Sequence, residues 1–223
     1  MDYIISLGGS LIVPEEIDYP FLKGFHALIL DFIKKQNRVA IISGGGKTCR
    51  KYQDAAKKVG SVSKEELDWI GIATTRLNAQ LLRTIFEKQA DHVVIKNPTQ
   101  KIEWKGSILI GAGWKPGCSS DYDAVLLAKN LGIKTIINLT NIDQVYDKDP
   151  KKYKDAKPLD KISWEKMQSI VGTKWSPGLN MPFDPVATKH AAKLGLKVVI
   201  LGSDLKNMKN FLEDKEFKGT VIE

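Results

Sequence analysis

The sequence predicts an α/β fold in which a largely parallel β-sheet is covered by helices on both faces. Short β-branched runs alternate with amphipathic helical stretches along the whole chain, and strands separated by helices imply βαβ units. No internal repeat or low-complexity linker divides the 223 residues, a length that fits one domain with a substantial core. We therefore expect a single domain spanning residues 1–223.

The strands are predicted from short apolar runs, several of which end in small or polar residues. A first strand leads into "GGS" at residues 8–10. The other runs are "RVAIIS" (38–43), "HVVIK" (92–96), "SILIGAG" (107–113), "TIINLT" (135–140), "KVVIL" (197–201) and "TVIE" (220–223). Runs of this length, rich in valine and isoleucine, are typical of strands buried within a sheet.

The helices are predicted from apolar residues that recur at helical spacing. Residues 25–33 carry one apolar face, and residues 49–60 read as a helix that ends at Gly60. Residues 66–89 form a long helix whose apolar face we assign to Ile70, Ala73, Leu77, Leu81 and Ile85.

The last predicted helix has the clearest end signals. Asp184 suits the N-cap, Pro185 the first helical position, and Gly195 the residue just past the end. We expect Asp121 and Asp123 to be first-turn acids favoured by a helix dipole. Trp164 and Trp175 are expected to pack internally or to lie at a subunit contact.

Composition narrows the class of function. Hydrophobic residues make up 43% of the chain and charged residues 27%, as in ordinary globular proteins, and no apolar run is long enough for a membrane helix. Only four of the 34 basic residues are arginine, so the net charge of +8 is a weak signal for nucleic-acid binding. The two cysteines and three histidines form no metal-ligand pattern. We expect a cytoplasmic protein that binds neither a membrane nor nucleic acid.

Three predicted strands run directly into turns rich in glycine or small residues, at residues 4–10, 40–50 and 108–121. Ligands of open α/β sheets bind where strands end, and such turns bring main-chain N–H groups close to a phosphate. The stretch "IISGGGKT" (41–48) is not a P-loop, because Ile41 stands where that motif needs its first glycine. Together the three turns predict a crevice that binds polyanions.

A fourth polar turn follows the strand at residues 135–140. Thr140, Asn141 and Asp143 are followed by Tyr146, Asp147 and Asp149. Hydroxyl, amide and carboxylate groups beside an aromatic ring suit a nucleoside with a magnesium-bound phosphate tail. The alternative is a polar loop in which Asn and Asp only form turns.

Six segments along the chain form a recognisable series. In order they are "GGSLIVPE", "SGGGKTCRKY", "DWIGIATTRLNAQLL", "GWKPGCSSDYDAVLLA", "TNIDQVYDKDP" and "PFDPVATK". Together they resemble the amino-acid kinase family, and most closely its archaeal-type uridylate (UMP) kinases. The resemblance covers nearly the whole chain, and the helix "GIATTRLNAQLL" and the segment "TN-x-D-x-VY-x-x-DP" are its most specific markers.

The resemblance implies a three-layer αβα sandwich with an acceptor-binding N-terminal half and an ATP-binding C-terminal half. It further implies transfer of the γ-phosphoryl group of ATP to UMP, giving UDP, with Mg²⁺ as cofactor. A homo-oligomer, usually a hexamer, is also implied. We expect no metal site that is formed by protein side chains alone.

Site residues follow from the resemblance, position by position. On the acceptor side, Gly45 would face UMP and Asp68 would accept hydrogen bonds from the ribose hydroxyls. The segment that would wrap UMP comprises Trp114, Lys115, Pro116, Gly117, Cys118, Ser119 and Ser120. The residues that would hold ATP are Gly9, Ser10, Gly46, Arg50, Thr140, Asn141, Tyr146 and Asp149. Asp143 would orient catalytic groups or metal, and Ser10 would lie against the transferring phosphate.

The sequence departs from the family at the transition-state cation. Many members have a lysine two residues before the first-strand glycines, and here that position is Ser6, as is common in the archaeal-type branch. Lys47 and Lys115 are the candidate replacements, and surface lysines are the alternative. Trp114 would stack on uracil or cover the pocket.

Other functions stay open from the sequence alone. A kinase of the same family could act on another phosphate, such as isopentenyl phosphate, although those enzymes place a histidine by the acceptor and no acceptor segment here contains one. A non-catalytic nucleotide-binding protein, similar to the molybdenum-storage proteins, is compatible with Ser6. A nucleic-acid-binding regulator is suggested only by the calculated isoelectric point of about 9.3.

Overall fold

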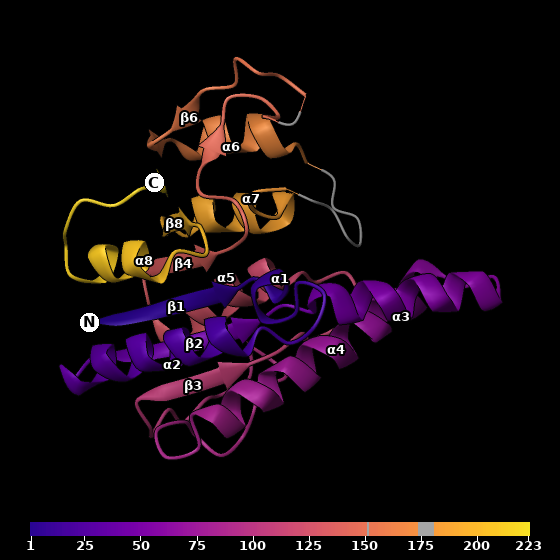
Figure 1. The fold of residues 1–223 in the computed structure, drawn as a ribbon, viewed down its shortest axis with the longest axis horizontal. Helices are drawn as coiled ribbons and strands as arrows, with labels where there is room; N and C mark the ends of the chain where they lie inside the picture. Colours follow the sequence, from indigo (N-terminus) through magenta and orange to yellow (C-terminus); the bar gives the residue numbers. More distant parts are fainter. Residues whose placement is uncertain (151, 174–180) are drawn as a thin grey trace.

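The fold is a seven-stranded sheet with helices on both faces, seen in a computed structural model that describes residues 1–150, 152–173 and 181–223 (Figure 1). Trp175 lies outside these residues. The strand order is β3-β2-β1-β4-β8-β9-β7. The bounds are β1 Asp2–Leu7, β2 Arg38–Ser43, β3 Ile108–Gly111, β4 Thr135–Leu139, β7 Lys161–Ile162, β8 Lys197–Leu201 and β9 Thr220–Ile222.

All neighbouring strands of the sheet are parallel except β8 and β9, which are antiparallel. The central strands β1, β2, β4 and β8 are buried along nearly their whole length, as expected for strands covered on both faces. A separate two-stranded sheet joins β5 Val145–Tyr146 to β6 Pro158–Leu159. The predicted α/β class and largely parallel sheet are confirmed.

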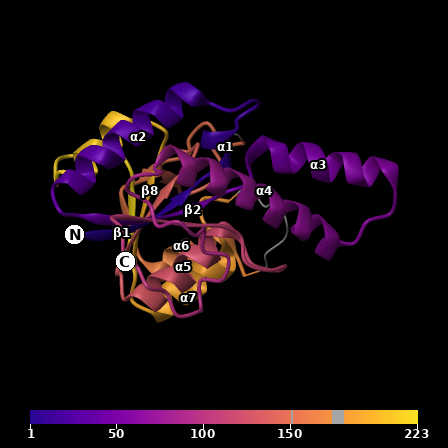
Figure 2. The same cartoon turned by 90° about the horizontal axis from the view of Figure 1, so that it is seen from below.

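Two helical layers cover the sheet (Figure 2). One contains α1 Gly9–Ile12, α2 Tyr19–Lys34, the C-terminal part of α4 Lys64–Ile85, and α8 Leu205–Leu212. The other contains α5 Ser120–Leu131, α6 Trp164–Val171 and α7 Pro185–Lys193. Each layer buries its own hydrophobic cluster against the sheet. The result is the expected αβα sandwich.

Helix α3 (Gly46–Val59) and the N-terminal part of α4 extend beyond the carboxyl ends of the strands, where they pack on each other (Figure 1). The predicted end of α3 at Gly60 is confirmed. The end signals of α7 are also confirmed, because Asp184 accepts a hydrogen bond from Ala187 N at 2.6 Å and Gly195 has a φ of +58°. Within the described residues, no helix is long and apolar enough to cross a membrane.

Two expectations were wrong. Residues 92–96 form no strand: Ile95 makes only an isolated bridge to Gly111, and Val93 is exposed. The apolar face assigned to α4 is also displaced, since Ala73 and Leu77 are exposed. The buried positions of α4 are Leu67, Ile72, Thr74, Asn78, Ala79 and Leu82. Trp164, in contrast, packs internally as expected, and its indole N–H donates to Leu196 O at 3.1 Å.

Candidate active site

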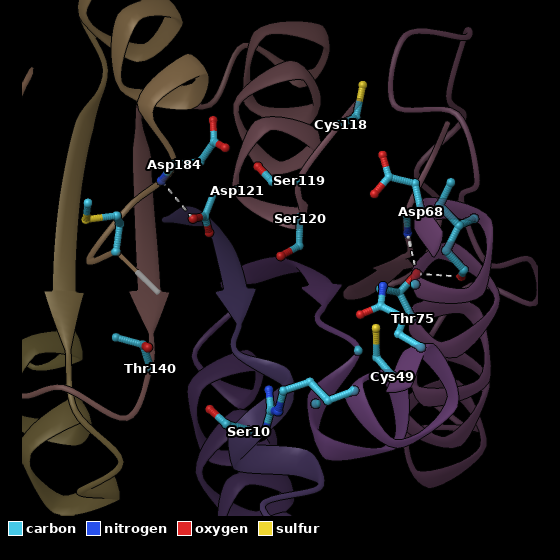
Figure 3. Close-up of a pocket in the computed structure, with 18 of the residues that line it drawn as sticks. Ser10, Cys49, Asp68, Thr75, Cys118, Ser119, Ser120, Asp121, Thr140 and Asp184 are labelled. Atoms are coloured by element: carbon cyan, nitrogen blue, oxygen red, sulfur yellow. Dashed lines mark hydrogen bonds between the residues drawn. The ribbon is translucent and has the colours of Figure 1, made fainter. Parts of the chain in front are cut away.

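A cavity of about 550 Å³ lies at the carboxyl ends of β1, β2, β3 and β4, where the glycine-rich turns were predicted to meet (Figure 3). It is bounded by the first turns of α1, α3 and α5, by the middle of α4 and by the N-terminus of α7. Its lining residues are Ser10, Gly45, Gly46, Cys49, Arg50, Gln53, Asp68, Gly71, Ile72, Thr75, Gly113, Cys118, Ser119, Ser120, Asp121, Thr140, Asn141, Met181 and Asp184.

The first two glycine turns touch each other at the floor of this region. A side chain at Gly9 would come within 2.6 Å of Gly45 N, and one at Gly46 would overlap the main chain of Gly9. Gly46 also has a φ of +67°, a conformation that other residues adopt at a cost of about 1–2 kcal/mol. Glycine is therefore required at both positions because two main chains meet there.

Helix α4 supports the second glycine turn from below. The amide of Asn78 donates to Gly44 O at 2.8 Å and to Gly45 O at 3.3 Å. Asn78 is almost fully buried, so these bonds satisfy its amide nitrogen and fix the two carbonyls. This role explains why a polar residue occupies the buried side of α4, which the apolar spacing did not indicate.

The acceptor segment, residues 113–120, leads from β3 into α5. Asp68 accepts a hydrogen bond from Gly117 N at 2.9 Å, which joins this segment to α4. Ser119 is the N-cap of α5 and accepts from Tyr122 N at 3.1 Å. The side chains of Ser119 and Ser120 lie at the cavity, where the free N–H groups of the first turn of α5 and its positive dipole end suit an anion (Figure 3).

Asp121 and Asp123 are first-turn acids of α5, as predicted, but they also lie inside the protein rather than only at its surface. Asp123 is fully buried, and burial raises its pKa to about 7. Asp121 accepts from Ser6 Oγ at 2.9 Å and from Asp184 N at 3.1 Å. Burial raises the pKa of Asp121 to about 6, and the nearby charge of Asp184 acts in the same direction.

Asp184 caps α7 and also lines the cavity. It is almost fully buried beside Asp121 at the cavity, and burial raises its pKa (Figure 3). Its Oδ1 caps α7, whereas its Oδ2 has no hydrogen-bond partner among the described residues. Since a buried oxygen without a partner is unfavourable, this atom is suited to a ligand.

The predicted site residues fall into two groups. Those that line the cavity are Ser10, Gly45, Gly46, Arg50, Asp68, Cys118, Ser119, Ser120, Thr140 and Asn141. Those that do not are Gly9, Lys47, Trp114, Lys115, Pro116, Gly117, Asp143, Tyr146 and Asp149. Gly9 and Gly117 nevertheless contact lining residues directly, through Gly46 and Asp68.

The candidate cations and Asp143 are engaged elsewhere. Lys47 pairs with Glu15 at 2.9 Å, and Lys115 Nζ lies 4.1 Å from the centroid of the Trp114 ring. Asp143 pairs with Lys218 at 2.8 Å, with both side chains largely exposed. Of the described side chains that line the cavity, only Arg50 is cationic.

The sequence did not indicate that several of the lining residues would lie at the cavity. Gln53 donates to Leu67 O at 2.8 Å, and Thr75 accepts from Gly113 N at 2.9 Å, so both hold the cavity wall. Cys49, Gly71, Ile72 and Met181 complete the wall. The marker helix containing Thr75 was identified as a motif, but nothing indicated which of its faces meets the cavity. Among the described residues, no three His, Cys, Asp or Glu side chains gather to hold a metal ion alone.

Comparison with known proteins identifies the family. The model of the amino acid kinase family matches residues 3–202. The uridylate kinase of Thermococcus kodakarensis is 35% identical, and the alignment covers both chains fully. That of Thermoplasma volcanium is 34% identical, with 99% of this chain and 96% of that protein covered.

Solved structures give the same result. The crystal structure of uridylate kinase from Archaeoglobus fulgidus superimposes with a TM-score of 0.86 at 31% identity, with both chains fully covered. The predicted resemblance is thus confirmed along the whole chain, in sequence and in fold. This protein belongs to the amino acid kinase family.

Proposed function

We propose that this protein is a uridylate kinase that transfers the γ-phosphoryl group of ATP to UMP. One observation carries the proposal: residues expected to bind UMP and residues expected to bind ATP line a single cavity. The first group includes Gly45, Asp68 and Ser119, and the second includes Ser10 and Thr140. The relatives named uridylate kinase support the choice of substrates.

The chemistry requires little beyond positioning. The phosphate of UMP is already anionic near neutral pH, since its second pKa is about 6, so no general base is needed. The first turn of α5, with Ser119 and Ser120, would hold this phosphate, and Asp68 would accept from the ribose. The turn at Gly46 and Ser10 would hold the γ-phosphate of ATP, in line with the acceptor oxygen. Thr140, Asn141, Tyr146 and Asp149 would hold the rest of ATP.

The donor set of the cavity fits Mg²⁺. Among the described residues, the lining carries Asp68, Asp121 and Asp184 against one cation, Arg50, so two phosphorylated ligands need added positive charge. The free, buried Oδ2 of Asp184 is the hard oxygen donor that Mg²⁺ prefers, together with phosphate oxygens. When bound, Mg²⁺ supplies charge neutralisation at the transferring group. We therefore propose Mg²⁺ as the cofactor.

Arg50 is the chain's own candidate to stabilise the transferring phosphate. It lies in the first turns of α3, directly after the Gly46 turn, and it lines the cavity. Lys47 and Lys115 would have to leave Glu15 and the Trp114 ring before they could contribute. Asp143 would likewise have to leave Lys218 to orient a catalytic group.

The proposal predicts a strong preference for UMP in a coupled assay of ADP release with Mg²⁺. We expect kcat/KM for UMP to exceed those for CMP, dUMP and AMP by at least about tenfold, because a site built to bond particular polar groups rejects analogues that lack them. Similar rates with all four acceptors, or none with UMP, would contradict it. Turnover of isopentenyl phosphate instead, or ATP binding without turnover, would favour the other family functions.

We also propose that the protein forms a homo-oligomer, a hexamer by resemblance. Trp69, Ala73 and Leu77 recur every four residues on an exposed face of α4, and Tyr52 and Val59 are exposed on the adjacent α3. Large apolar side chains that gather on one surface are typical of subunit interfaces. A second copy of this chain is the occupant that the family resemblance favours.

The self-association prediction concerns Leu77, whose side chain is 64% exposed. We expect Leu77→Lys to raise the dissociation constant of the oligomer by at least about tenfold, because a buried lysine in an interface lacks a partner. Sedimentation velocity over a concentration series measures this. Val93→Lys is the control, since Val93 is equally exposed but far from α3 and the middle of α4 in the chain. Equal sedimentation of both variants would contradict an interface at α4.

The remaining expectations also stay part of the proposal. We propose a cytoplasmic protein that does not bind nucleic acid; the free Cys49 and Cys118 are consistent with a reducing compartment.

A further inference from the structure

Side chains of α4 and α5 bind all the main-chain polar groups of Gly113 and Trp114, at the start of the acceptor segment. Gly113 N donates to Thr75 Oγ1 at 2.9 Å, and Gly113 O accepts from Arg76 Nε at 3.3 Å. Trp114 N donates to Asp123 Oδ2 at 3.1 Å, and Trp114 O accepts from Arg76 Nη2 at 3.1 Å. All four main-chain polar groups of this dipeptide are thus bound by side chains from the two helices.

Arg76 and Asp123 provide three of these four bonds, and they carry opposite charges. The guanidinium of Arg76 spans both carbonyls at once, a geometry that its planar fork permits and a lysine cannot reproduce. Asp123 is fully buried, and its Oδ1 has no partner among the described residues. Burial raises the pKa of Asp123 to about 7, whereas the nearby charge of Arg76 opposes this shift. Keeping a carboxyl group in such a place is unfavourable for folding alone.

The dipeptide controls the geometry of the residues after it. Gly113 lines the cavity itself, and five residues later Cys118, Ser119 and Ser120 line it again. Between them, a further side-chain anchor among the described residues is Asp68, which accepts from Gly117 N. A shift at Trp114 would therefore move the segment relative to Asp68 and Gly45, which line the same cavity.

We propose that Arg76 and Asp123 are positioning residues that fix the acceptor segment 113–120 for its substrate. They touch no reacting atom, and they act through the main chain of Gly113 and Trp114. This inference rests on the proposed function only in naming UMP as the acceptor. Loss of either side chain weakens acceptor binding and leaves the ATP side unchanged.

The kinetic test compares Arg76→Met, Arg76→Lys and Asp123→Asn with wild type. We expect Arg76→Met to raise KM for UMP by roughly ten- to a hundredfold, the range for losing a hydrogen bond to a charged group, with KM for ATP within about twofold. Arg76→Lys should recover part of the loss, and Asp123→Asn should have a smaller effect because it keeps an acceptor for Trp114 N–H. Arg38→Lys is the matched control, since Arg38 is exposed at the start of β2 and pairs with Asp2. Equal rises in both KM values would overturn the proposal.

A second readout needs no activity. Amide hydrogen exchange of unliganded protein should be at least about tenfold faster in residues 113–118 of Arg76→Met than in wild type or Arg38→Lys, because the anchors are lost. Unchanged exchange in folded Arg76→Met would overturn the proposal, as would faster exchange with an unchanged KM for UMP. If Arg76→Met does not fold, KM for UMP, KM for ATP and amide exchange of residues 113–118 are measured in Arg76→Lys and Asp123→Asn instead. The same outcomes would then overturn the proposal. If wild type does not phosphorylate UMP, the proposed function fails, whereas segment-specific exchange would still support the anchoring role.

Discussion

Gly46→Ala is expected to destabilise the protein by roughly 2–5 kcal/mol and to lower kcat/KM by at least about a hundredfold. Two effects combine at this position. A methyl group would overlap the main chain of Gly9, and the φ of +67° is unfavourable for alanine. Relief of the overlap must separate the two glycine turns, and these turns form the proposed phosphate site. Urea unfolding gives the stability change, and the ADP-release assay gives the activity.

Two control variants separate the causes. Gly132 has a φ of +70° with nothing near its missing side chain, so Gly132→Ala reports the conformational cost alone, about 1–2 kcal/mol. Gly60 has an ordinary extended φ of −163° and equally open surroundings, so Gly60→Ala should be nearly neutral. If Gly46→Ala were no more harmful than Gly132→Ala, the contact between the two turns would not be tight.

Asp123→Asn is expected to stabilise the protein strongly at pH 8 and less than half as much at pH 5. The pKa of Asp123 rises from an ordinary 3.8 to about 7 in the folded state, mainly through burial. The folded protein therefore holds a proton that the unfolded chain has released. Stability from this group is fully present below about pH 4 and is lost as the pH rises through about 7. The full difference amounts to roughly 4 kcal/mol, and asparagine, being neutral, avoids it.

Thermal or urea unfolding at pH 5, 6.5 and 8 measures this effect. Asp121, Cys118 and Arg76 face the same region, and the comparison of one variant with wild type at each pH removes most of their contribution. Asp31→Asn, at an exposed position on α2, is the control and should not change the pH profile in the same direction. A stability difference that is constant between pH 5 and pH 8 would show that Asp123 does not take up a proton on folding.

The destabilising effect of Asp123 at neutral pH and its proposed anchoring of Trp114 are linked. A neutral side chain is expected to give a more stable protein at neutral pH, whereas a carboxylate adds its charge beside Arg76 to the proposed anchoring of Trp114. Sites that keep a destabilising group are commonly functional ones.

Elements with one consistent environment were predictable from the sequence. The strand at residues 38–43 is buried from Val39 onward, and its apolar run gave its bounds correctly. Helix α7 has a recognisable capping residue at its start, Asp184, and a glycine just past its end, Gly195. The three glycine turns meet because the carboxyl ends of parallel strands share one edge of the sheet.

The two wrong predictions, the apolar face of α4 and the strand at residues 92–96, concern segments whose packing partners differ along their length. Helix α4 packs on α3 near its start and on the main core near its end, and Thr74 and Asn78 face inward between these parts. No single apolar stripe describes such a helix. Residues 92–96 satisfy the local pattern of a strand, but β3 offers them only one bridge, at Ile95.

The burial of two acidic residues of α5 could not be predicted from the sequence, for a different reason. Asp121 and Asp123 occupy positions where the dipole of α5 favours a carboxylate whether it is exposed or buried. Their burial depends on α4, α7 and the acceptor segment, which approach from distant parts of the chain. A local pattern therefore could not distinguish a solvated cap from a buried anchor.

The position of β9 has a consequence for synthesis. This strand contains residues 220–222 and lies between β8 and β7, so β7 joins the sheet through β9 alone. During translation, β8 therefore keeps an open hydrogen-bonding edge until residues 220–222 have left the ribosome. The nascent chain can form the five-stranded parallel part from β3 to β8 before then, and until β9 pairs with it the edge of β8 is exposed.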